Sequence, residues 1–159
     1  MLHTMSIAYK PMRPGQEDAV ATLIRQLPRD LGLDVQPLIT GDVIRQWGDE
    51  VHVMVAEDSG LICGVCLWFM HYSTWRAMRG CYVCDLYVME HLRGKKIGQG
   101  LLQAASKAAR ELGAGYLRLD VTRLHGAPKA FYTKLGFVAD EEDLTMFLEP
   151  HHFKTYVGD

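Results

Sequence analysis

Two pairs of cysteines have the spacing of a zinc-binding motif. Cys63 and Cys66 stand in "CGVC", and Cys81 and Cys84 stand in "CYVCDLYV". Two CxxC pairs at this separation are typical of structural zinc sites, in which four thiolates surround one metal ion. The same cysteines lie inside apolar runs, which are typical of β-strands. Residues 81–88 are therefore either half of a zinc site or a strand that ends in an active centre.

The apolar surroundings favour the strand. Both sulfurs of a zinc-binding pair must reach one metal at about 2.3 Å, so such pairs lie on tight turns. Residues i and i+3 of a strand point to opposite faces, and a hairpin register that brings Cys63 opposite Cys84 would put the other two cysteines on the other face. Gly64 could bend the first pair, which keeps zinc as the less favoured alternative. We expect buried, unreactive cysteines and no metal site.

The loop after this strand contains basic residues and glycines. It reads "MEHLRGKKIGQGLL" over residues 89–102 and leads into an Ala-rich helix. A helix N-terminus presents unpaired N–H groups with a partial positive charge, and glycine lets a ligand approach the backbone, so the pattern predicts a phosphate-binding loop. A basic surface loop is the structural alternative. The nucleotide motifs fit poorly, because "GQGLLQ" lacks the third glycine of a Rossmann motif and "GKK" lacks the Ser or Thr of a Walker motif.

The elements that must position these residues follow from periodicity and turn signals. Strands are expected at 6–12, 51–57, 61–72, 80–89, 116–121 and 143–149, and helices at 17–27, 41–48, 100–112 and 127–135. This order predicts an α/β fold with a mixed sheet.

Length and composition predict one ordinary globular domain. The chain has 159 residues, 48% of them hydrophobic, and a formal charge of −2. We expect a single domain over residues 1–159, with no bulk attraction for nucleic acid or an anionic membrane, so that a small molecule or a protein is the default substrate. No window reaches the roughly 18 apolar residues of a membrane span, and no signal peptide is recognised. A cytoplasmic location with reduced cysteines is expected.

Two motifs resemble the GNAT superfamily of acetyl-CoA-dependent N-acetyltransferases. "KKIGQG" is similar to the family's Q/R-x-x-G-x-G/A motif, with Lys95 in the Q/R position, and "FYTKLGF" at 131–137 is similar to its closing aromatic motif. The resemblance covers about residues 50–148. Within the superfamily, "HYSTW" and an acidic residue before "LYV" resemble the diamine and thialysine acetyltransferase branch. The sequence departs from that branch at Cys84, where the branch has Glu, and from the superfamily at His125, where Asn is frequent.

The resemblance implies a single-domain GNAT-like fold, in which a mixed, mostly antiparallel sheet splays between its fourth and fifth strands and is flanked by helices. It implies an acyltransferase that moves an acetyl group from acetyl-CoA to a primary amine of a small metabolite, by direct attack in a ternary complex. A polyamine and a lysine analogue are the acceptors that the narrower resemblance suggests, and a homodimer is among the expectations. Tyr132 takes the place of the general acid and Asp85 that of the base, with Val88 as the favoured oxyanion donor. The implied cofactor-binding residues are Leu86, Tyr87, Val88, Arg93, Gly94, Lys95, Lys96, Ile97, Gly98, Gln99, Gly100, His125 and Lys134.

Two alternatives stay open. One is a GNAT-like module that binds acyl-CoA or a partner without turnover, and the other is acetylation of a protein or peptide amine. Tyr132 and Asp85 favour an enzyme, whereas the missing Glu and Asn favour a module. Cys84 and Asp85 are neighbours, so they are expected to face opposite sides of the strand unless a bulge turns both toward the active-site cleft.

Overall fold

The computed structural model describes residues 5–122 and 126–158. Contacts between Cα atoms divide the chain into two compact units, Met1–Asp120 and Val121–Asp159, which we call the first and second units. The prediction of one domain over residues 1–159 stays a prediction. His125, a predicted cofactor-binding residue, lies outside the described residues.

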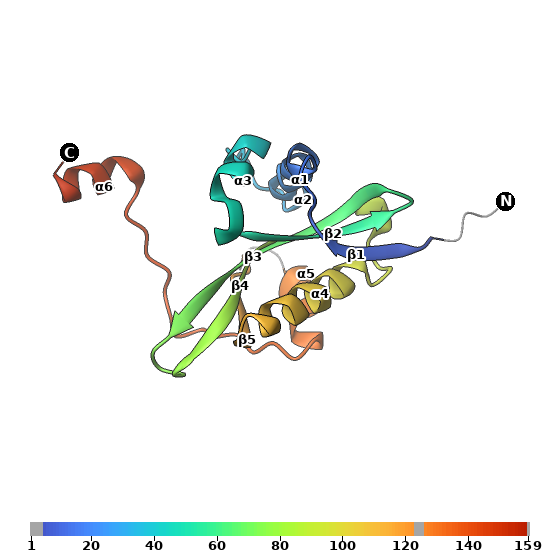
Figure 1. The fold of residues 1–159 in the computed structure, drawn as a ribbon. Helices are drawn as coiled ribbons and strands as arrows, with labels where there is room; N and C mark the ends of the chain where they lie inside the picture. Colours follow the sequence, from blue (N-terminus) through green and yellow to red (C-terminus); the bar gives the residue numbers. More distant parts are fainter. Residues whose placement is uncertain (1–4, 123–125, 159) are drawn as a thin grey trace. The chain divides into compact units, whose positions relative to one another are not determined.

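A five-stranded mixed sheet forms the centre of the first unit (Figure 1). Its strands lie in the order of the sequence, and the first four pair antiparallel with their neighbours, whereas the fifth runs parallel to the fourth. The strands are β1 (Ile7–Pro11), β2 (His52–Asp58), β3 (Leu61–Ser73), β4 (Met78–Val88) and β5 (Ala114–Leu119). The predicted mixed, mostly antiparallel sheet is confirmed.

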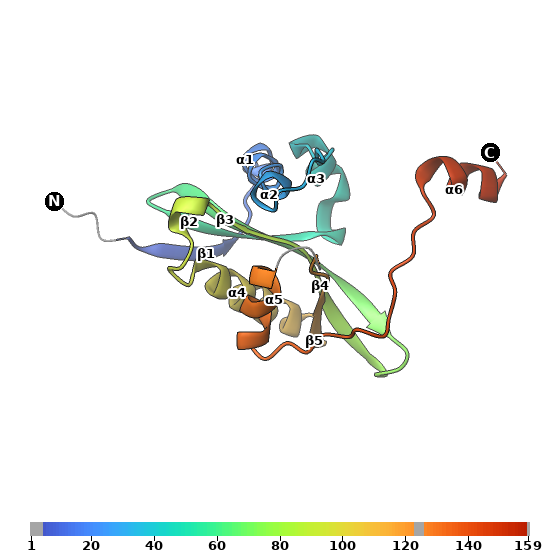
Figure 2. The same cartoon turned by 180° about the vertical axis from the view of Figure 1, so that it is seen from behind.

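Helices cover both faces of this sheet (Figures 1 and 2). One face carries α1 (Glu17–Ile24), α2 (Leu27–Asp30), α3 (Gly41–Trp47) and the short 3-10 helix η1 (Gly48–Glu50), and the other carries α4 (Ile97–Glu111). The first helix ends earlier than expected, because Pro28 has no N–H to continue it and instead lies in the first turn of α2. Apolar side chains of α1 and α3, among them Val20, Ile24 and Ile44, pack on the buried face of β2 and β3, which contributes Val55 and Leu67.

Both CxxC pairs lie within strands, as predicted. Cys63 and Cys66 belong to β3, and Cys81 and Cys84 belong to β4. The observed register pairs Cys66 with Leu86 and Cys81 with Met70, so it differs from the cysteine-to-cysteine register considered above. Within residues 5–122 and 126–158, no three metal-ligating side chains form a cluster.

The sheet splays where β5 ends. Pairing between β4 and β5 runs from Arg79 and Ala114 to Val83 and Leu119, while β4 continues to Val88. The second half of β4 therefore keeps one edge without a β5 partner, which confirms the predicted splay between the fourth and fifth strands. A 3-10 turn, η2 (Glu90–Leu92), follows β4 and leads into the loop before α4.

The second unit contains two helices, α5 (Gly126–Lys134) and α6 (Pro150–Val157). The strand expected at 143–149 is not formed, because these residues join no strand ladder in the described part of the chain. Leu144, Met146 and Phe147 accordingly keep more than 80% of their surface exposed. Among the described residues, no helix is both long enough and apolar enough to cross a bilayer.

Candidate active site

A β-bulge at Cys84 determines which side chains β4 presents. Leu67 of β3 pairs with Asp85, whereas the next residue, Trp68, pairs with Val83, so Cys84 is the extra residue on β4. A bulge places two residues opposite one and changes the alternation of side chains between the faces. Cys84 and Asp85 consequently line the same pocket. The bulge is thus the exception to the expected placement of these neighbours on opposite faces.

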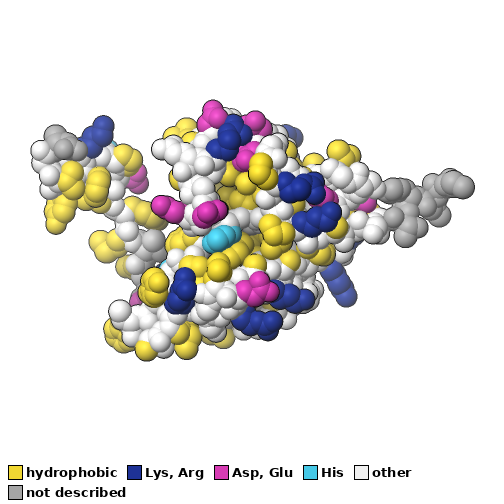
Figure 3. Space-filling view, in the orientation of Figure 1, with side chains coloured by type: hydrophobic (Ala, Val, Ile, Leu, Met, Phe, Trp, Pro, Cys, Tyr) yellow, Lys and Arg dark blue, Asp and Glu magenta, His cyan; other side chains and the backbone are white. Residues whose placement is uncertain are grey.

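The pocket lies wholly within the first unit and has a volume of about 610 Å³. Its floor is formed by side chains of the two central strands, namely Leu67, Phe69, Cys84 and Asp85. Helices α1 to α3 contribute Ile24, Leu27, Pro28, Val43 and Trp47, and the neighbouring segments contribute residues 37–39 and Val51. On the face drawn in Figure 3, hydrophobic side chains gather between the helical layer and the sheet. The volume lies within the range of small-molecule sites.

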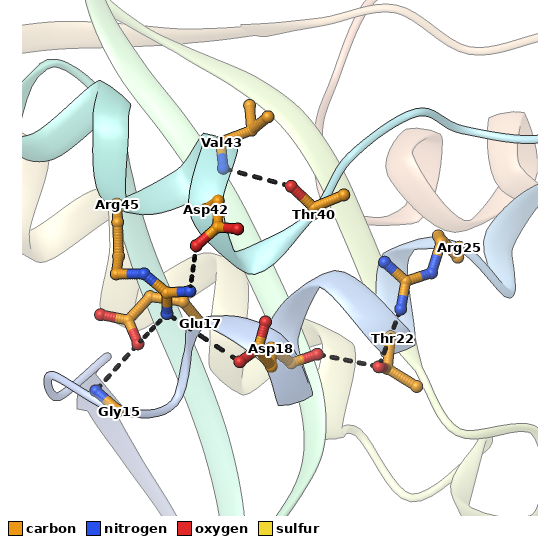
Figure 4. Close-up of polar contacts among 9 residues, drawn as sticks. All are labelled: Gly15, Glu17, Asp18, Thr22, Arg25, Thr40, Asp42, Val43 and Arg45. Carbon is orange, nitrogen blue, oxygen red and sulfur yellow. Dashed lines mark hydrogen bonds and ion pairs between the residues drawn. The ribbon is translucent and has the colours of Figure 1, made fainter.

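Polar contacts between α1 and α3 hold the helical wall of the pocket in place (Figure 4). Arg45 of α3 forms ion pairs with Glu17 of α1 at 3.4 Å and with Asp42 at 2.6 Å. Arg25 donates a hydrogen bond of 2.8 Å to the carbonyl of Ile39, a residue of the pocket lining. The contacts of Arg45 with Glu17 and of Arg25 with Ile39 join separate segments of the chain, so the sequence patterns did not reveal them.

Asp85 is the only residue with a charged side chain among the described residues that line the pocket. Removal from water raises the pKa of its carboxyl group above the ordinary value of 3.8. No described residue forms a hydrogen bond or ion pair with this carboxylate that would offset the loss of solvent. Burial and then the nearby Asp85 charge raise the pKa of the Cys84 thiol to about 11, so this thiol is protonated at neutral pH. Asp85 is the better base of the two.

The open edge of β4 exposes main-chain groups next to this pocket. The Met89 N–H donates to the Cys63 carbonyl of β3 at 3.0 Å. This hydrogen bond shows that the main-chain groups of Met89 face β3. Because main-chain groups alternate along a strand, Leu86 and Val88 direct theirs to the open edge, and Tyr87 directs its own toward β3. Leu86 and Val88 can therefore donate to a ligand oxygen, whereas the Tyr87 amide faces its neighbouring strand. The role of each as a cofactor-binding residue stays a prediction.

The loop before α4 forms a cradle of main-chain amides. Gly94 and Lys96 adopt the left-handed conformation, with φ of 78° and 63°, and no side chain caps the helix that follows. The first helical hydrogen bond runs from the Gly100 N–H to the Lys96 carbonyl at 3.0 Å. The amides of Ile97, Gly98 and Gln99 thus lie in the first turn, where they have no partner within the helix. With Lys95 and Lys96 exposed beside them, these amides suit an anionic ligand.

Arg93, also predicted to bind the cofactor, is engaged within the protein. Its guanidinium group pairs with Asp30 of α2 at 2.5 Å and donates to the Val88 carbonyl at 2.9 Å. It also lies over the ring of Tyr87, 5.4 Å from the ring centroid, and the Tyr87 hydroxyl donates to the Gln26 side chain at 2.9 Å. Arg93 therefore links the end of β4 to the helix that lines the pocket.

Gly100 has a packing reason for lacking a side chain. A Cβ atom at this position would lie 2.2 Å from the hydroxyl oxygen of Tyr9. Tyr9 belongs to β1, so the glycine allows α4 to approach the first strand closely. The sequence motif places Gly100 in the phosphate loop and gives no sign of Tyr9, because a contact between residues so far apart leaves no local pattern.

The remaining predicted residues lie in the second unit. Tyr132 is partly buried in α5, and its ring contacts those of Phe131 and Phe137 at centroid distances of 5.0 and 5.4 Å. Its carbonyl accepts hydrogen bonds from Leu135 and Phe137, which closes the helix. Lys134 is exposed in the last turn of this helix. The motif "FYTKLGF" is thus a helix end in which the Tyr132 ring contacts two aromatic neighbours.

Comparison with known proteins relates the sequence to one family. A family model described as "Acetyltransferase (GNAT) domain" matches residues 49–139. Thialysine N-epsilon-acetyltransferase of Mus musculus is 29% identical over 138 residues, which cover 79% of this chain and 78% of that protein. L-ornithine N5-acetyltransferase of Arabidopsis thaliana is 32% identical over 76 residues, which cover 48% of this chain and 33% of that protein.

Solved structures share the fold at low sequence identity. An integron cassette protein from the mobile metagenome of V. cholerae superposes with a TM-score of 0.79 at 16% identity, covering 98% of this chain and 100% of the other. An aminoglycoside acetyltransferase from an uncultured soil metagenomic sample, in complex with trehalose, superposes with a TM-score of 0.75 at 15% identity, covering 90% and 95%. These similarities support the fold alone.

Proposed function

Because the chain belongs to the GNAT acetyltransferase family, whose members are acyltransferases that use acetyl-CoA as co-substrate, we propose that it acetylates a primary amine of a small metabolite. The observation that carries this proposal is the bulged end of β4. It puts the Asp85 carboxylate into an apolar pocket beside the strand edge that β5 leaves open. The names of the mouse and Arabidopsis relatives, which denote acetylation of thialysine and ornithine, support a small amine as acceptor.

The residues of the first unit fit such a co-substrate. The amides of Ile97, Gly98 and Gln99 and the side chains of Lys95 and Lys96 would hold its phosphate groups. The main-chain groups of the open β4 edge would hold the neighbouring amide-containing arm. When bound, acetyl-CoA supplies an acetyl thioester, whose carbonyl carbon the amine attacks and whose sulfur departs as a thiolate.

The side chains then have three tasks. Asp85 accepts a proton from the ammonium group, directly or through a water molecule, so that the neutral nitrogen can form the new C–N bond. The N–H groups of the open β4 edge, with Val88 favoured, donate to the oxygen that gains negative charge. The Tyr132 hydroxyl, on the strength of its motif, gives its proton to the departing sulfur and regains one from the nitrogen, which after the attack still carries the proton that it must lose to become an amide. The products are an N-acetyl amine and a free thiol.

A panel of amines tests the proposal. Each amine is incubated with the full chain and acetyl-CoA, and the free thiol is measured together with the acetylated product by mass spectrometry. We expect stoichiometric thiol and N-acetyl product with at least one small primary amine. Binding of acetyl-CoA without product from any amine would contradict the proposal and support a binding module, and product from peptides alone would identify a peptide amine as acceptor.

A further inference from the structure

Arg93 joins two parts of the first unit through one guanidinium group. This group pairs with the Asp30 carboxylate of α2 at 2.5 Å, and its Nε donates to the Val88 carbonyl of β4 at 2.9 Å. It also lies over the Tyr87 ring, 5.4 Å from the ring centroid. A guanidinium group is planar and carries its donors in fixed directions, so it can hold two partners at once in a defined geometry.

The contact with Val88 lies at the open edge of β4. Val88 directs its main-chain groups away from β3, and Arg93 binds the Val88 carbonyl there. The N–H of the same residue is left for a ligand and is the favoured donor to the oxyanion. A residue has only two soft backbone dihedrals, so a hydrogen bond that holds the carbonyl of Val88 also limits the direction of its N–H.

The contact with Asp30 lies on the wall of the pocket. Helix α2 contributes Leu27 and Pro28 to the lining, and Asp30 is its last residue. The Tyr87 hydroxyl donates at 2.9 Å to Gln26, which directly precedes this helix. Side chains from the end of β4 and from the loop after it thus hold both ends of α2. A molecule that displaces this wall therefore acts on the strand edge as well.

From these contacts we infer that Arg93 is a positioning residue, which couples the acceptor pocket to the strand edge where the thioester reacts, and that it is not a ligand of the cofactor's phosphate groups. The inference rests on the proposed function and deepens it. With Arg93 in place, α2 and Val88 keep one relative arrangement, so the pocket wall and the oxyanion donor are aligned before the substrates meet. Without it, both substrates still bind, but the Val88 N–H loses its fixed direction.

Kinetics and calorimetry separate positioning from phosphate binding. We expect Arg93→Ala to lower kcat at least about tenfold, as for a misplaced oxyanion donor, while the Kd of acetyl-CoA stays within about threefold. Arg93→Lys should remain at least about fivefold below the wild type, because one ammonium group cannot replace the planar fork between Asp30 and Val88. A tenfold loss of acetyl-CoA affinity in Arg93→Ala, or full activity in Arg93→Lys, would contradict the inference.

Asp30 shows whether Arg93 acts through its partner. Asp30→Ala should lower kcat to a similar extent, and the double variant with Arg93→Ala should be within about twofold of either single variant, because both changes remove the same contact. Arg29 is exposed in the same helix, so Arg29→Ala is the matched control and should keep kcat within about twofold. The Tm of each variant shows that it is folded. Losses that multiply in the double variant would mean that the two residues act independently, which would overturn the inference.

Hydrogen exchange tests the coupling without any turnover. The amides of Asp30 and Leu31 donate to the carbonyls of Gln26 and Leu27, so their exchange reports the opening of α2. We expect CoA to slow this exchange at least about threefold in the wild type and less than about 1.5-fold in Arg93→Ala. No slowing in the wild type would contradict the coupling.

The two readouts also separate this inference from the proposed function. If exchange depends on CoA and Arg93 as expected but no amine is acetylated, the proposed function fails while the coupling stands. If amines are acetylated but neither kcat nor exchange depends on Arg93, the coupling fails alone.

Discussion

Asp85 and Cys84 reach the same pocket, yet only one of them is suited to remove the amine proton. We predict that Cys84→Ala keeps most of the wild-type kcat/KM, because a thiol with a pKa of about 11 is protonated at neutral pH. Asp85→Asn should lose at least tenfold, since the amide cannot accept a proton. A base acts in its deprotonated form, so wild-type activity should fall as the pH drops through a midpoint above 3.8, the ordinary Asp value, and this limb should change in Asp85→Asn. The opposite ranking in two folded variants would show that Cys84 is the functional neighbour.

The carboxylate that helps the reaction should cost the protein stability. The folded state raises the pKa of Asp85, so the folded protein binds the proton more tightly than the unfolded chain. Stability is then lost as the pH rises from the unfolded pKa through the folded one, and the penalty is complete once the pH exceeds the folded pKa. We predict that Asp85→Asn raises the Tm at pH 7 and that this gain shrinks as the pH approaches 3.8.

Glu17 provides a control of opposite sign. A hydrogen bond from its own N–H lowers the pKa of this carboxyl group most, and the Gly15 N–H and the charge of Arg45 lower it further. Together they outweigh the loss of solvent, which acts in the opposite direction. Such a group contributes stability above the unfolded pKa, and the contribution disappears as the pH falls through the folded pKa. Glu17→Gln should therefore lower the Tm at pH 7, and this loss should diminish in acid. A lower Tm for Asp85→Asn at pH 7 would mean that its carboxylate has a stabilising partner in solution.

At the scale of elements, the site depends on how β4 ends and α4 begins. Strand β4 continues beyond the end of its pairing with β5, and the loop that follows it leads into α4. The first amides of α4 have no hydrogen-bond partner within the helix. The two glycines at the start of that helix differ in role, because Gly100 packs against Tyr9 of β1. Loss of function in a Gly100 variant would therefore report on packing as much as on ligand binding, which makes Gly98 the residue to test.

We predict that acetyl-CoA raises the Tm of the wild type, because a ligand that binds the native state alone stabilises it. Gly98→Asp should abolish this shift, since it adds a side chain and a negative charge at the start of α4. Gln103→Asp adds one negative charge at an exposed position farther along the same helix, and it should keep the shift. Equal shifts in all three proteins would exclude the α4 N-terminus as the phosphate site.

At the scale of the whole molecule, the proposed acid and base come from different units. Asp85 belongs to the first unit, and Tyr132 belongs to the second. Removal of the phenolic oxygen in Tyr132→Phe should lower kcat by roughly tenfold to a thousandfold while acetyl-CoA affinity stays within about twofold, as expected for a lost acid–base group. The ring contacts with Phe131 and Phe137 do not involve the hydroxyl group, so the phenylalanine should keep them. Single-turnover kinetics measure the chemical step, and an unchanged rate there would remove Tyr132 from the mechanism.

The sequence by itself determined the features that local periodicity and composition control. The apolar runs around both CxxC pairs predicted strands, and β3 and β4 confirm them. The basic, Gly-containing loop before an Ala-rich helix indicated the start of α4 within a few residues. These features can be predicted from the sequence because each helix or strand has its own side-chain period, and that period determines which of its residues share a face. Two short motifs were sufficient to indicate the family.

Only the tertiary structure decided in which register the strands pair and which residues contact one another across the fold. The bulge at Cys84 arises from pairing with β3, and it alone brings Cys84 and Asp85 to one pocket. The pairing of Arg93 with Asp30 and the packing of Gly100 on Tyr9 join residues far apart in the sequence. The expected strand at 143–149 was wrong for the same reason, because alternating apolar residues form a strand only where a partner strand accepts their main-chain hydrogen bonds. Pairing of distant residues is a property of the folded chain, so local patterns do not encode it.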